Sequence, residues 1–576
     1  MATSNRAGIG WPATSRNATP WRCARPIGSG RSVVSWPSTE RCRSARALRW
    51  AAIVALCLWL PLAFADESPR FLILHVDATT AIDLDRMLAE GRLPNVSSAF
   101  EGGMSFTSVG LYPGSTPVIV SRLHGRGPEG VLSAIGFGGF DRETGRVVPE
   151  QRVFLDMLWG FPRRSWTNFV HGVPGLDGLA GLAMQNLPEL LERYRVIEFY
   201  WFNTDGIGHL FGAEAHAVSL ERFDAHLGRV LPQLGLDDLN LILYTDHGMT
   251  FGTVGFDVDA LLEERLGDEM VHFKYPNLYL RDPARAQALA RRLTAPGGLD
   301  FAFYRRDERR VEGSLNGAFV RFEAVGDGIR YASPEDPLGY AELGYDGAAL
   351  TRDGWVALTR DALFPATPPN VFDYLQISAV GDLVVGLNPP RVPGGMLEAG
   401  NHAGLVQTDL VVKVLARGPQ VQVLEERGLP WLHELYRSIP ELEFGHRPVR
   451  ELHEFEVRYD LEDLGVVGRV RWSPAYRVRV AAELGPPGWA AWGEVDVFSS
   501  YLTRWWLGVG ASSDDAGWGL MVRGMVEVDV GDARLRVEGG TRPSGWSVGV
   551  GATFRVARGV RLAYDAPGAV GVAFEW

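Results

Sequence analysis

Short apolar runs alternate with helical patterns along residues 66–450 of this 576-residue chain. The clearest apolar runs are FLILHVD (71–77), VIEFYWFNTD (196–205), LNLILYTDHG (239–248) and DLVVKVLARG (409–418). Continuous apolar runs separated by amphipathic stretches are typical of a mostly parallel sheet with helices on both faces. Such sheets bind ligands at the carboxyl ends of their strands, where this pattern places Asp77, Asp205, Asp246 and His247.

The alternation of apolar runs with helical patterns is interrupted between about residues 251 and 400. This segment contains a helical pattern at 282–293, alternating strand patterns at 301–306 and 318–325, and a Pro/Gly-rich exit at 388–396. We interpret it as a cap inserted into an α/β domain, positioned over the carboxyl ends of its strands. Because caps commonly select the substrate, the natural substrate stays open at this stage.

From about residue 451 a strict two-residue alternation replaces the helical pattern. Apolar side chains alternate with small or polar ones in GWSVGVGATFRV (545–556), and similar runs occur at 488–498, 505–511, 519–530 and 568–576. Alternating strands of about ten residues with short turns predict an antiparallel β-barrel-like domain in residues 451–576. The aromatic C-terminus favours an outer-membrane barrel, and the alternative is a soluble antiparallel sandwich packed on the rest of the chain.

Residues 1–65 are expected to be a disordered leader followed by a signal peptide. An apolar stretch at 50–65 follows an Arg-rich segment and ends in Ala63-Phe64-Ala65, the small-x-small pattern of a signal peptidase site. A membrane anchor is the alternative, although the run is shorter than the ~20 residues that a spanning helix needs. We therefore expect secretion across the inner membrane and a periplasmic or outer-membrane-associated protein.

The composition restricts which side chains could bind a metal and argues against one class of partner. All three cysteines lie before residue 60, so the mature chain would hold a metal through histidine and carboxylate ligands. The formal net charge is −12, and the first 65 residues hold nine arginines and a single acidic residue, so the remainder is more acidic still. An acidic chain argues against a nucleic-acid-binding module, which calls for a basic surface.

Candidate chemistry lies in two loops at the start of the catalytic domain. Asp77 follows the first apolar run, where a carboxylate is often a helix cap. In Tyr112-Pro113-Gly114-Ser115-Thr116-Pro117, Thr116 suits the N-cap and Pro117 the first helical position. The Thr116 hydroxyl would then lie among backbone N–H groups that favour an anion, but it needs a metal or a base to act as a nucleophile. Ser115 is the competing nucleophile.

Three further motifs contribute metal-ligand types. Asp205 and His209 lie four positions apart, a spacing that lets both reach one cation if the turn is tight, and the glycines between them permit such a turn. Asp246 and His247 end a strand, and both would be costly to bury unless they were paired or bound to a metal. His402 is flanked by glycines just before another apolar run. Each motif taken alone could have a purely structural role. The whole set in this order is a much more specific signal of a functional site.

This order of motifs resembles the alkaline phosphatase superfamily, and the chain is most similar to its type I phosphodiesterase and nucleotide pyrophosphatase branch. Leu93-Pro94-Asn95, Gly102-Gly103 and the Pro113-to-Thr116 loop match the opening of that branch. The resemblance covers roughly residues 70–270 and 385–420. It implies an alkaline-phosphatase-like fold and hydrolysis of a phosphodiester or phosphomonoester substrate through a phosphothreonine intermediate on Thr116.

The resemblance also implies two divalent metal ions, with zinc favoured by the donor types. One ion would be held by Asp205, His209 and His402, and the other by Asp77, Asp246, His247 and the Thr116 oxygen. Two departures stand out: Ala78 replaces the usual glycine, and the asparagine that often follows the nucleophile is missing. Arg122 and His124 are candidates for the non-metal phosphate ligand, with surface residues as the alternative reading.

Two other functions remain open from the sequence. One is a catalytically idle, metal-containing binding domain anchored at the outer membrane by the C-terminal barrel. The other is a membrane-embedded structural protein. The presence of every metal-ligand position together with Thr116 favours the hydrolase, because a decayed site would be expected to have lost some of them.

Overall fold

The computed structural model describes residues 69–575 apart from 128–134, 137, 160–168, 172–175, 253, 395–398, 445–452, 461–464, 476, 486–487, 558 and 567–568. The predicted leader and signal peptide, the expected domain boundary near residue 450 and the aromatic residue Trp576 lie outside these residues. Within the described part of the chain, no helix has the length and apolar character needed to cross a bilayer.

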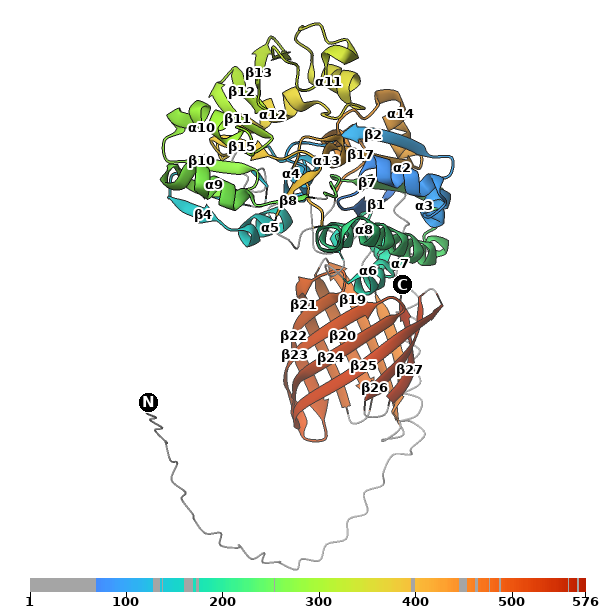
Figure 1. The fold of residues 1–576 in the computed structure, drawn as a ribbon. Helices are drawn as coiled ribbons and strands as arrows, with labels where there is room; N and C mark the ends of the chain where they lie inside the picture. Colours follow the sequence, from blue (N-terminus) through green and yellow to red (C-terminus); the bar gives the residue numbers. More distant parts are fainter. Residues whose placement is uncertain are drawn as a thin grey trace, which may run out of the picture. The chain divides into compact units, whose positions relative to one another are not determined.

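A six-stranded sheet forms the centre of the α/β part (Figure 1). In spatial order its strands are β2 (Met104–Val109), β17 (Val411–Arg417), β7 (Leu239–Thr245), β1 (Arg70–Val76), β6 (Val196–Trp201) and β5 (Phe169–His171). β1 pairs in parallel with β6 and β7, and β5 pairs in parallel with β6. β17 runs antiparallel to both of its neighbours. The expected mostly parallel sheet is thus confirmed, with β17 as the exception.

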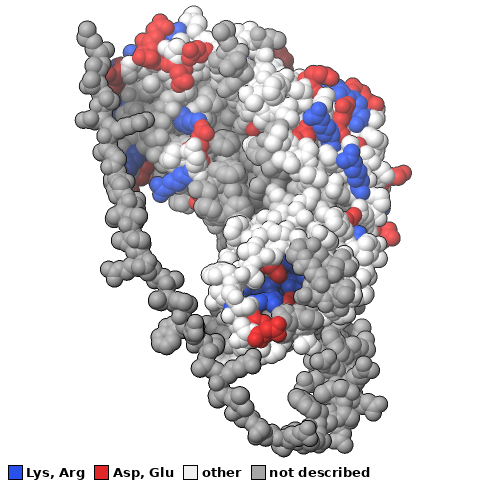
Figure 2. Space-filling model, turned by 90° about the horizontal axis from the view of Figure 1, so that it is seen from below, with Lys and Arg blue, Asp and Glu red and all other residues white. Residues whose placement is uncertain are grey.

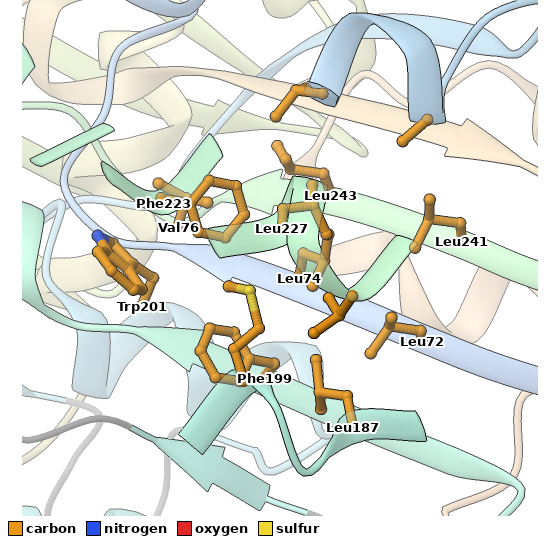
Figure 3. Packing of buried hydrophobic residues seen from close by; sticks show 14 of the residues in the cluster. Leu72, Leu74, Val76, Leu187, Phe199, Trp201, Phe223, Leu227, Leu241 and Leu243 are labelled. Carbon is orange, nitrogen blue, oxygen red and sulfur yellow. The ribbon is translucent and has the colours of Figure 1, made fainter. Parts of the chain in front are cut away.

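Side chains of β1 alternate between two apolar cores. Leu72, Leu74 and Val76 pack on one face with residues of α2, α3, α6, α7 and α8 (Figure 3). Phe71 and Ile73 pack on the other face with residues of α4 and α14. The helices are α2 (Ala81–Ala89), α3 (Pro94–Ala99), α4 (Thr116–Leu123), α5 (Glu150–Trp159), α6 (Asp177–Met184), α7 (Leu187–Arg193), α8 (Asn203–Val230), α13 (Gln407–Leu410) and α14 (Val423–Arg427). Helices therefore cover both faces, as expected.

The segment between β7 and β17 forms a second sheet in which every pairing is antiparallel. Its order is β14 (Gly328–Ala332), β13 (Ala318–Val325), β12 (Arg310–Leu315), β11 (Phe301–Asp307), β15 (Leu383–Gly386), β10 (Asn277–Leu280) and β9 (Met270–Lys274). The accompanying helices are α9 (Val258–Leu266), α10 (Ala286–Leu293), α11 (Arg352–Thr359) and α12 (Thr367–Leu375). Tyr112, which precedes α4, packs edge-on against Tyr374 of α12 at 5.4 Å between ring centres. This segment shares an apolar core with the loop that carries Thr116.

Two small two-stranded sheets complete the α/β part. They pair β3 (Gly139–Asp141) with β4 (Arg146–Val148), and β8 (Val254–Phe256) with β16 (Arg391–Pro393). The second pair joins the beginning and the end of the segment between β7 and β17.

Ten antiparallel strands close into a barrel at the C-terminal end, because β18 pairs with both β19 and β27. The strands are β18 (Glu454–Asp460), β19 (Gly465–Ala475), β20 (Val478–Gly485), β21 (Gly488–Ser499), β22 (Thr503–Asp514), β23 (Gly517–Val530), β24 (Ala533–Arg542), β25 (Gly545–Ala557), β26 (Val560–Ala566) and β27 (Ala569–Glu575). The barrel interpretation is confirmed and the sandwich alternative is wrong, because the strands form a single closed sheet.

The barrel has charged residues inside and apolar residues outside. Buried side chains include Arg458, Arg469, Arg471, Arg479, Arg523, Arg561, Glu456, Glu494 and Glu527. They form ion pairs such as Arg479 with Glu494 at 2.6 Å and Arg469 with Glu483. In Figure 2, basic and acidic residues gather inside the otherwise white barrel. This distribution is the reverse of the apolar cores of the α/β part.

Candidate active site

The predicted ligands meet at one edge of the central sheet. Asp77 follows β1, Asp205 lies in the first turn of the helix after β6, and Asp246 and His247 follow β7. His402 lies in the loop before β17, and because β17 is antiparallel it begins at the edge where the parallel strands end. The reversed strand therefore brings His402 to the other ligands.

The first cluster consists of Asp205, His209 and His402. Asp205 Oδ1 lies 3.3 Å from His209 Nε2 and 3.4 Å from His402 Nε2. The tight turn that the glycines would permit does not form, because Asp205 and His209 lie in the helical start of α8, before its kink at Gly212, and project from the same side. The spacing of four residues on the helix brings the two side chains together without a turn at the glycines.

The second cluster surrounds His247. Its Nε2 atom lies 3.3 Å from Asp77 Oδ1 and 3.5 Å from Asp246 Oδ2. The Thr116 hydroxyl oxygen lies 3.4 Å from Asp77 Oδ1 and 3.3 Å from His247 Nε2. The His247 ring also stacks on that of His402, with 4.1 Å between ring centres. All seven predicted residues thus lie together in two adjoining clusters.

Thr116 is the first residue of α4 rather than its N-cap. Ser115 has the extended N-cap conformation, and its carbonyl accepts hydrogen bonds from the backbone N–H groups of Val118 and Ile119. The predicted cap was thus wrong by one residue, and Pro117 takes the second helical position, where its missing N–H is equally harmless. Thr116 therefore lies at the positive end of the helix, with its hydroxyl facing the carboxylates.

Comparison with known proteins agrees with this geometry. Residues 96–295 match the family model of type I phosphodiesterase / nucleotide pyrophosphatase. The matched segment contains Thr116, Asp205, His209, Asp246 and His247. The match confirms the resemblance seen in the motifs and the class of enzyme, a phosphoric ester hydrolase.

Solved structures with detectable similarity include phosphonoacetate hydrolase from Sinorhizobium meliloti 1021 in complex with phosphonoformate. It is 16% identical and has a TM-score of 0.37, and the match covers 65% of this chain and 96% of that one. Murine ectonucleotide pyrophosphatase / phosphodiesterase 5 is 12% identical with a TM-score of 0.42, and the match covers 65% of this chain and 97% of that one. No curated protein sequence matches the chain.

Burial and the neighbouring side chains set the protonation of the carboxylates Asp77 and Asp205. Burial, followed by the nearby carboxylates of Asp246 and Asp205, raises the pKa of Asp77 well above its usual value. Burial also raises the pKa of Asp205, but the adjoining imidazoles of His209 and His402 outweigh it and hold that pKa well below its usual value. This site thus concentrates negative charge in a buried space, which a cation would relieve.

Backbone carbonyls orient the three imidazoles of the site. Nδ1 of His209 donates to the Gly400 carbonyl at 2.8 Å, that of His402 to Gly114 at 2.6 Å, and that of His247 to Gly248 at 2.9 Å. A carbonyl only accepts, so each Nδ1 carries the proton and each Nε2 of a neutral ring presents a lone pair. Burial lowers the pKa of His247 to about 4, which keeps that ring neutral at neutral pH.

These lone pairs point at carboxylate oxygens, which are also acceptors. Asp205 Oδ1 and Asp246 Oδ2 are buried and have no hydrogen-bond donor of their own. The groups Asp205-His209-His402 and Asp77-Asp205-His247 each have ligand atoms within 4.8 Å of one another. Acceptors that face each other at this distance repel unless a cation lies between them. The residues therefore fit two divalent ions, and the nitrogen and oxygen donors suit zinc.

Sequence reasoning missed a layer of aromatic and imidazole side chains beneath the carboxylates. His75 lies in register with Tyr200 and Tyr244 on the adjacent strands, and its ring stacks between theirs at 4.3 and 4.5 Å. Tyr200 donates a hydrogen bond to Asp77 Oδ2, and His75 Nε2 lies 3.3 Å from Asp246 Oδ1. The available signal was a histidine within the otherwise apolar run FLILHVD.

The structure places Ala78 and the two candidate phosphate ligands, Arg122 and His124. Ala78 has a φ of 49°, a left-handed conformation that favours glycine, and its N–H lies 3.3 Å from Asp246 Oδ1. His124 is buried, with Nε2 3.1 Å from Glu198 Oε2. Burial lowers the pKa of Arg122, and the acidic group that acts on it is Asp373 of α12. These contacts favour structural roles for His124 and Arg122.

Proposed function

We propose that this protein hydrolyses phosphodiesters or phosphomonoesters with Thr116 as the nucleophile and two divalent metal ions, zinc in preference, as cofactors. The observation that carries the proposal is the set of neutral imidazole nitrogens facing buried carboxylate oxygens beside the Thr116 hydroxyl. Asp205, His209 and His402 would hold one ion, and Asp77, Asp246, His247 and Thr116 the other. The family match of the segment that contains Thr116 supports the same reaction class.

Each residue has a definable task in this reaction. Asp77 and His247 hold the Thr116 oxygen toward the clusters, and Tyr200 fixes the Asp77 carboxylate by donating to its other oxygen. The N-terminus of α4 provides a favourable field for the anionic phosphoryl group. Two bound cations would stabilise negative charge on the attacking and leaving oxygens. Thr116 Oγ1 attacks phosphorus, the leaving oxygen departs, and water then hydrolyses the phosphothreonine.

A pair of substrates tests this proposal. The full chain, supplied with zinc, is assayed with a nitrophenyl phosphate monoester and a nitrophenyl phosphate diester, before and after chelation and after zinc is restored. We expect turnover of at least one ester, its loss on chelation and its recovery with zinc. Zinc binding without any turnover would instead favour a catalytically idle binding domain, and turnover that survives chelation would contradict the two-metal site.

We propose further that the barrel anchors the enzyme in an outer membrane. Exposed apolar side chains cover its outside, including Val495, Leu507, Val509, Leu520, Val522, Val537, Val548 and Val550. Charged residues inside and apolar residues outside are the pattern of transmembrane barrels, whose outer surface contacts lipid.

Exposed aromatic residues form a belt near each end of the barrel. Trp489, Trp518 and Trp546 are the second residues of β21, β23 and β25, at the end away from the C-terminus. Phe498, Trp505 and Phe574 lie near the opposite end. Trp505 is paired with Val526, eight residues from Trp518 on β23. This is about 26 Å along the strand and about 20 Å along a barrel axis at a strand tilt of ~40°, close to the ~25 Å apolar band of outer-membrane barrels.

Fractionation tests the anchor. The chain expressed in a bacterium with an outer membrane should sediment with that membrane, resist a high-salt and alkaline wash, and dissolve in detergent. Recovery in the soluble periplasmic fraction without detergent would remove the anchor while leaving the hydrolase proposal intact.

A further inference from the structure

Helix α6 exposes an apolar face that a water-facing helix would not be expected to have. Leu176, its N-cap residue, is 53% exposed, Leu179 is 45% exposed and Leu182 is 37% exposed. These three leucines, called the α6 face below, lie three residues apart and so share one side of the helix. The only other exposed position from 176 to 184 is Gly178. A surface helix normally has polar residues on its outer side.

The α6 face lies on a helix whose N-terminal end is tied to the start of α8. Asp177 accepts hydrogen bonds from Asn203 Nδ2 at 2.9 Å and Ser219 Oγ at 3.1 Å, and its other oxygen from Arg222 at 2.8 Å. Asn203 begins α8 and precedes the ligand Asp205 by two residues. The N-terminal end of α6 is therefore fixed close to the first turn that carries the candidate metal ligands.

The opposite end of α6 is tied to the barrel. Asn186, two residues beyond α6, donates to the Tyr501 carbonyl at 3.3 Å and the Asp529 carbonyl at 3.1 Å, and accepts from the Gly531 N–H at 2.6 Å. These partners lie at the turns after β21 and β23. Both turns are at the barrel end of the Phe498, Trp505 and Phe574 belt.

An ion-pair hub on α7 reinforces this attachment. Glu189 contacts Arg534 at 3.0 Å, Arg555 at 2.7 Å and Arg561 at 2.8 Å. These arginines come from β24, β25 and β26, so one carboxylate joins three neighbouring strands. The chain from α6 to α7 is thereby held against the rim of the barrel.

We propose that the α6 face contacts the bilayer that holds the barrel, in the boundary between headgroups and acyl chains. The proposal rests on the barrel anchor proposed above. Two observations support the contact. The apolar belt on the outside of the barrel reaches the rim to which the end of α6 is bound, and the exposed side of α6 is also apolar. Apolar helix faces without charge lie favourably in this boundary region. The contact would hold the first turn of α8 near the membrane surface.

Single cysteines test the contact without relying on activity. In the full chain, Cys23, Cys42 and Cys57 are changed to alanine, which leaves no other cysteine. Leu179→Cys probes the α6 face, Val509→Cys the outside of the barrel, and Leu343→Cys an exposed leucine of the segment between β7 and β17. Each is labelled with the fluorophore NBD and reconstituted into vesicles of phosphatidylethanolamine and phosphatidylglycerol, with and without spin-labelled lipid.

We expect blue-shifted emission and quenching by spin-labelled lipid at positions 179 and 509, and neither at 343. Quenching at 509 with water-like emission at 179 would overturn the α6 contact and leave the anchor intact. Apolar emission at 179 without lipid quenching would also overturn it, because another segment of the chain would then cover the face. No quenching at any position would remove the anchor together with the contact. Zinc-dependent turnover, measured on the same samples, reports on the hydrolase proposal separately.

Discussion

Backbone carbonyls place a proton on Nδ1 of three histidines of the site. Because Nδ1 of His209, His247 and His402 donates to a carbonyl, each neutral ring can offer only Nε2 to the buried carboxylates. The unprotonated Nε2 of a neutral ring cannot donate to those oxygens, which is why we propose that a cation lies between them. The same carbonyl contacts orient the rings and so favour binding over ring rotation.

Removal of one of these rings should therefore remove one ion. We expect His402→Ala to lower the bound zinc from about two ions per chain to about one, because Asp205 and His209 alone leave that cation with too few ligands. His272→Ala, in the segment between β7 and β17, is the matched control and should keep both ions. Elemental analysis of the purified proteins measures the outcome, and unchanged zinc in His402→Ala would take this residue out of the ligand set.

A buried histidine outside the site should make stability depend on pH. Burial, followed by the positive charges of Arg437, Arg122 and Arg352, lowers the pKa of His433 to about 3. The unfolded imidazole titrates near ~6.5, so between these values only the unfolded chain takes up the proton. His433 therefore contributes its full stability above the unfolded pKa of ~6.5. This contribution is lost as the pH falls from there toward the folded pKa of about 3.

The size of this effect is about 2 kcal/mol at a pH of about 5. His433→Gln should lose correspondingly less free energy of unfolding than the wild type when the pH is lowered from about 7 to about 5. Denaturant titrations of both proteins at the two pH values measure the difference. Identical losses would show that His433 is protonated in the native state.

At the scale of elements, the sequence predicted where strands lie and end. It predicted the direction of each strand in the sheet and the boundaries of the helices less well. The apolar runs placed Asp77 and Asp246 directly after strands correctly, because the hydrophobic period is local, whereas Asp205 lies in the first turn of α8 rather than at the end of β6. The antiparallel direction of β17 was not visible, since a buried strand has the same pattern in either direction. Gly206 and Gly208 suggested a turn, but the chain is helical there, and glycine lowers helix propensity without forbidding a helix.

The joint between α7 and the barrel gives a prediction at the same scale. Glu189→Ala removes the shared partner of Arg534, Arg555 and Arg561, and the loss of one member of a buried ionic group costs about 3 kcal/mol. Glu425→Ala, an exposed residue of α14, is the matched control. Thermal unfolding in detergent should show a lower midpoint for Glu189→Ala alone. Equal midpoints for the two variants would mean that the hub does not stabilise the joint.

At the scale of the whole chain, two opposite distributions of polarity coexist in one polypeptide. The α/β part buries leucine, valine and phenylalanine on both sides of its sheet, whereas the barrel buries arginine and glutamate and exposes valine, leucine and tryptophan. The two-residue alternation predicted the strands of the barrel. It could not predict their closure, which depends on the pairing of β18 with β27 across the full length of the domain.

The most direct test of the account compares Thr116→Ala with Ser115→Ala in zinc content and in turnover of the nitrophenyl ester that the wild type hydrolyses. Thr116 faces the ligand clusters, whereas Ser115 forms the N-cap of α4. We predict that both variants keep about two zinc ions, that Ser115→Ala keeps turnover within about tenfold of the wild type, and that Thr116→Ala loses roughly a thousandfold or more, as expected for loss of a nucleophile. Turnover retained by Thr116→Ala, or abolished only in Ser115→Ala, would contradict the assignment.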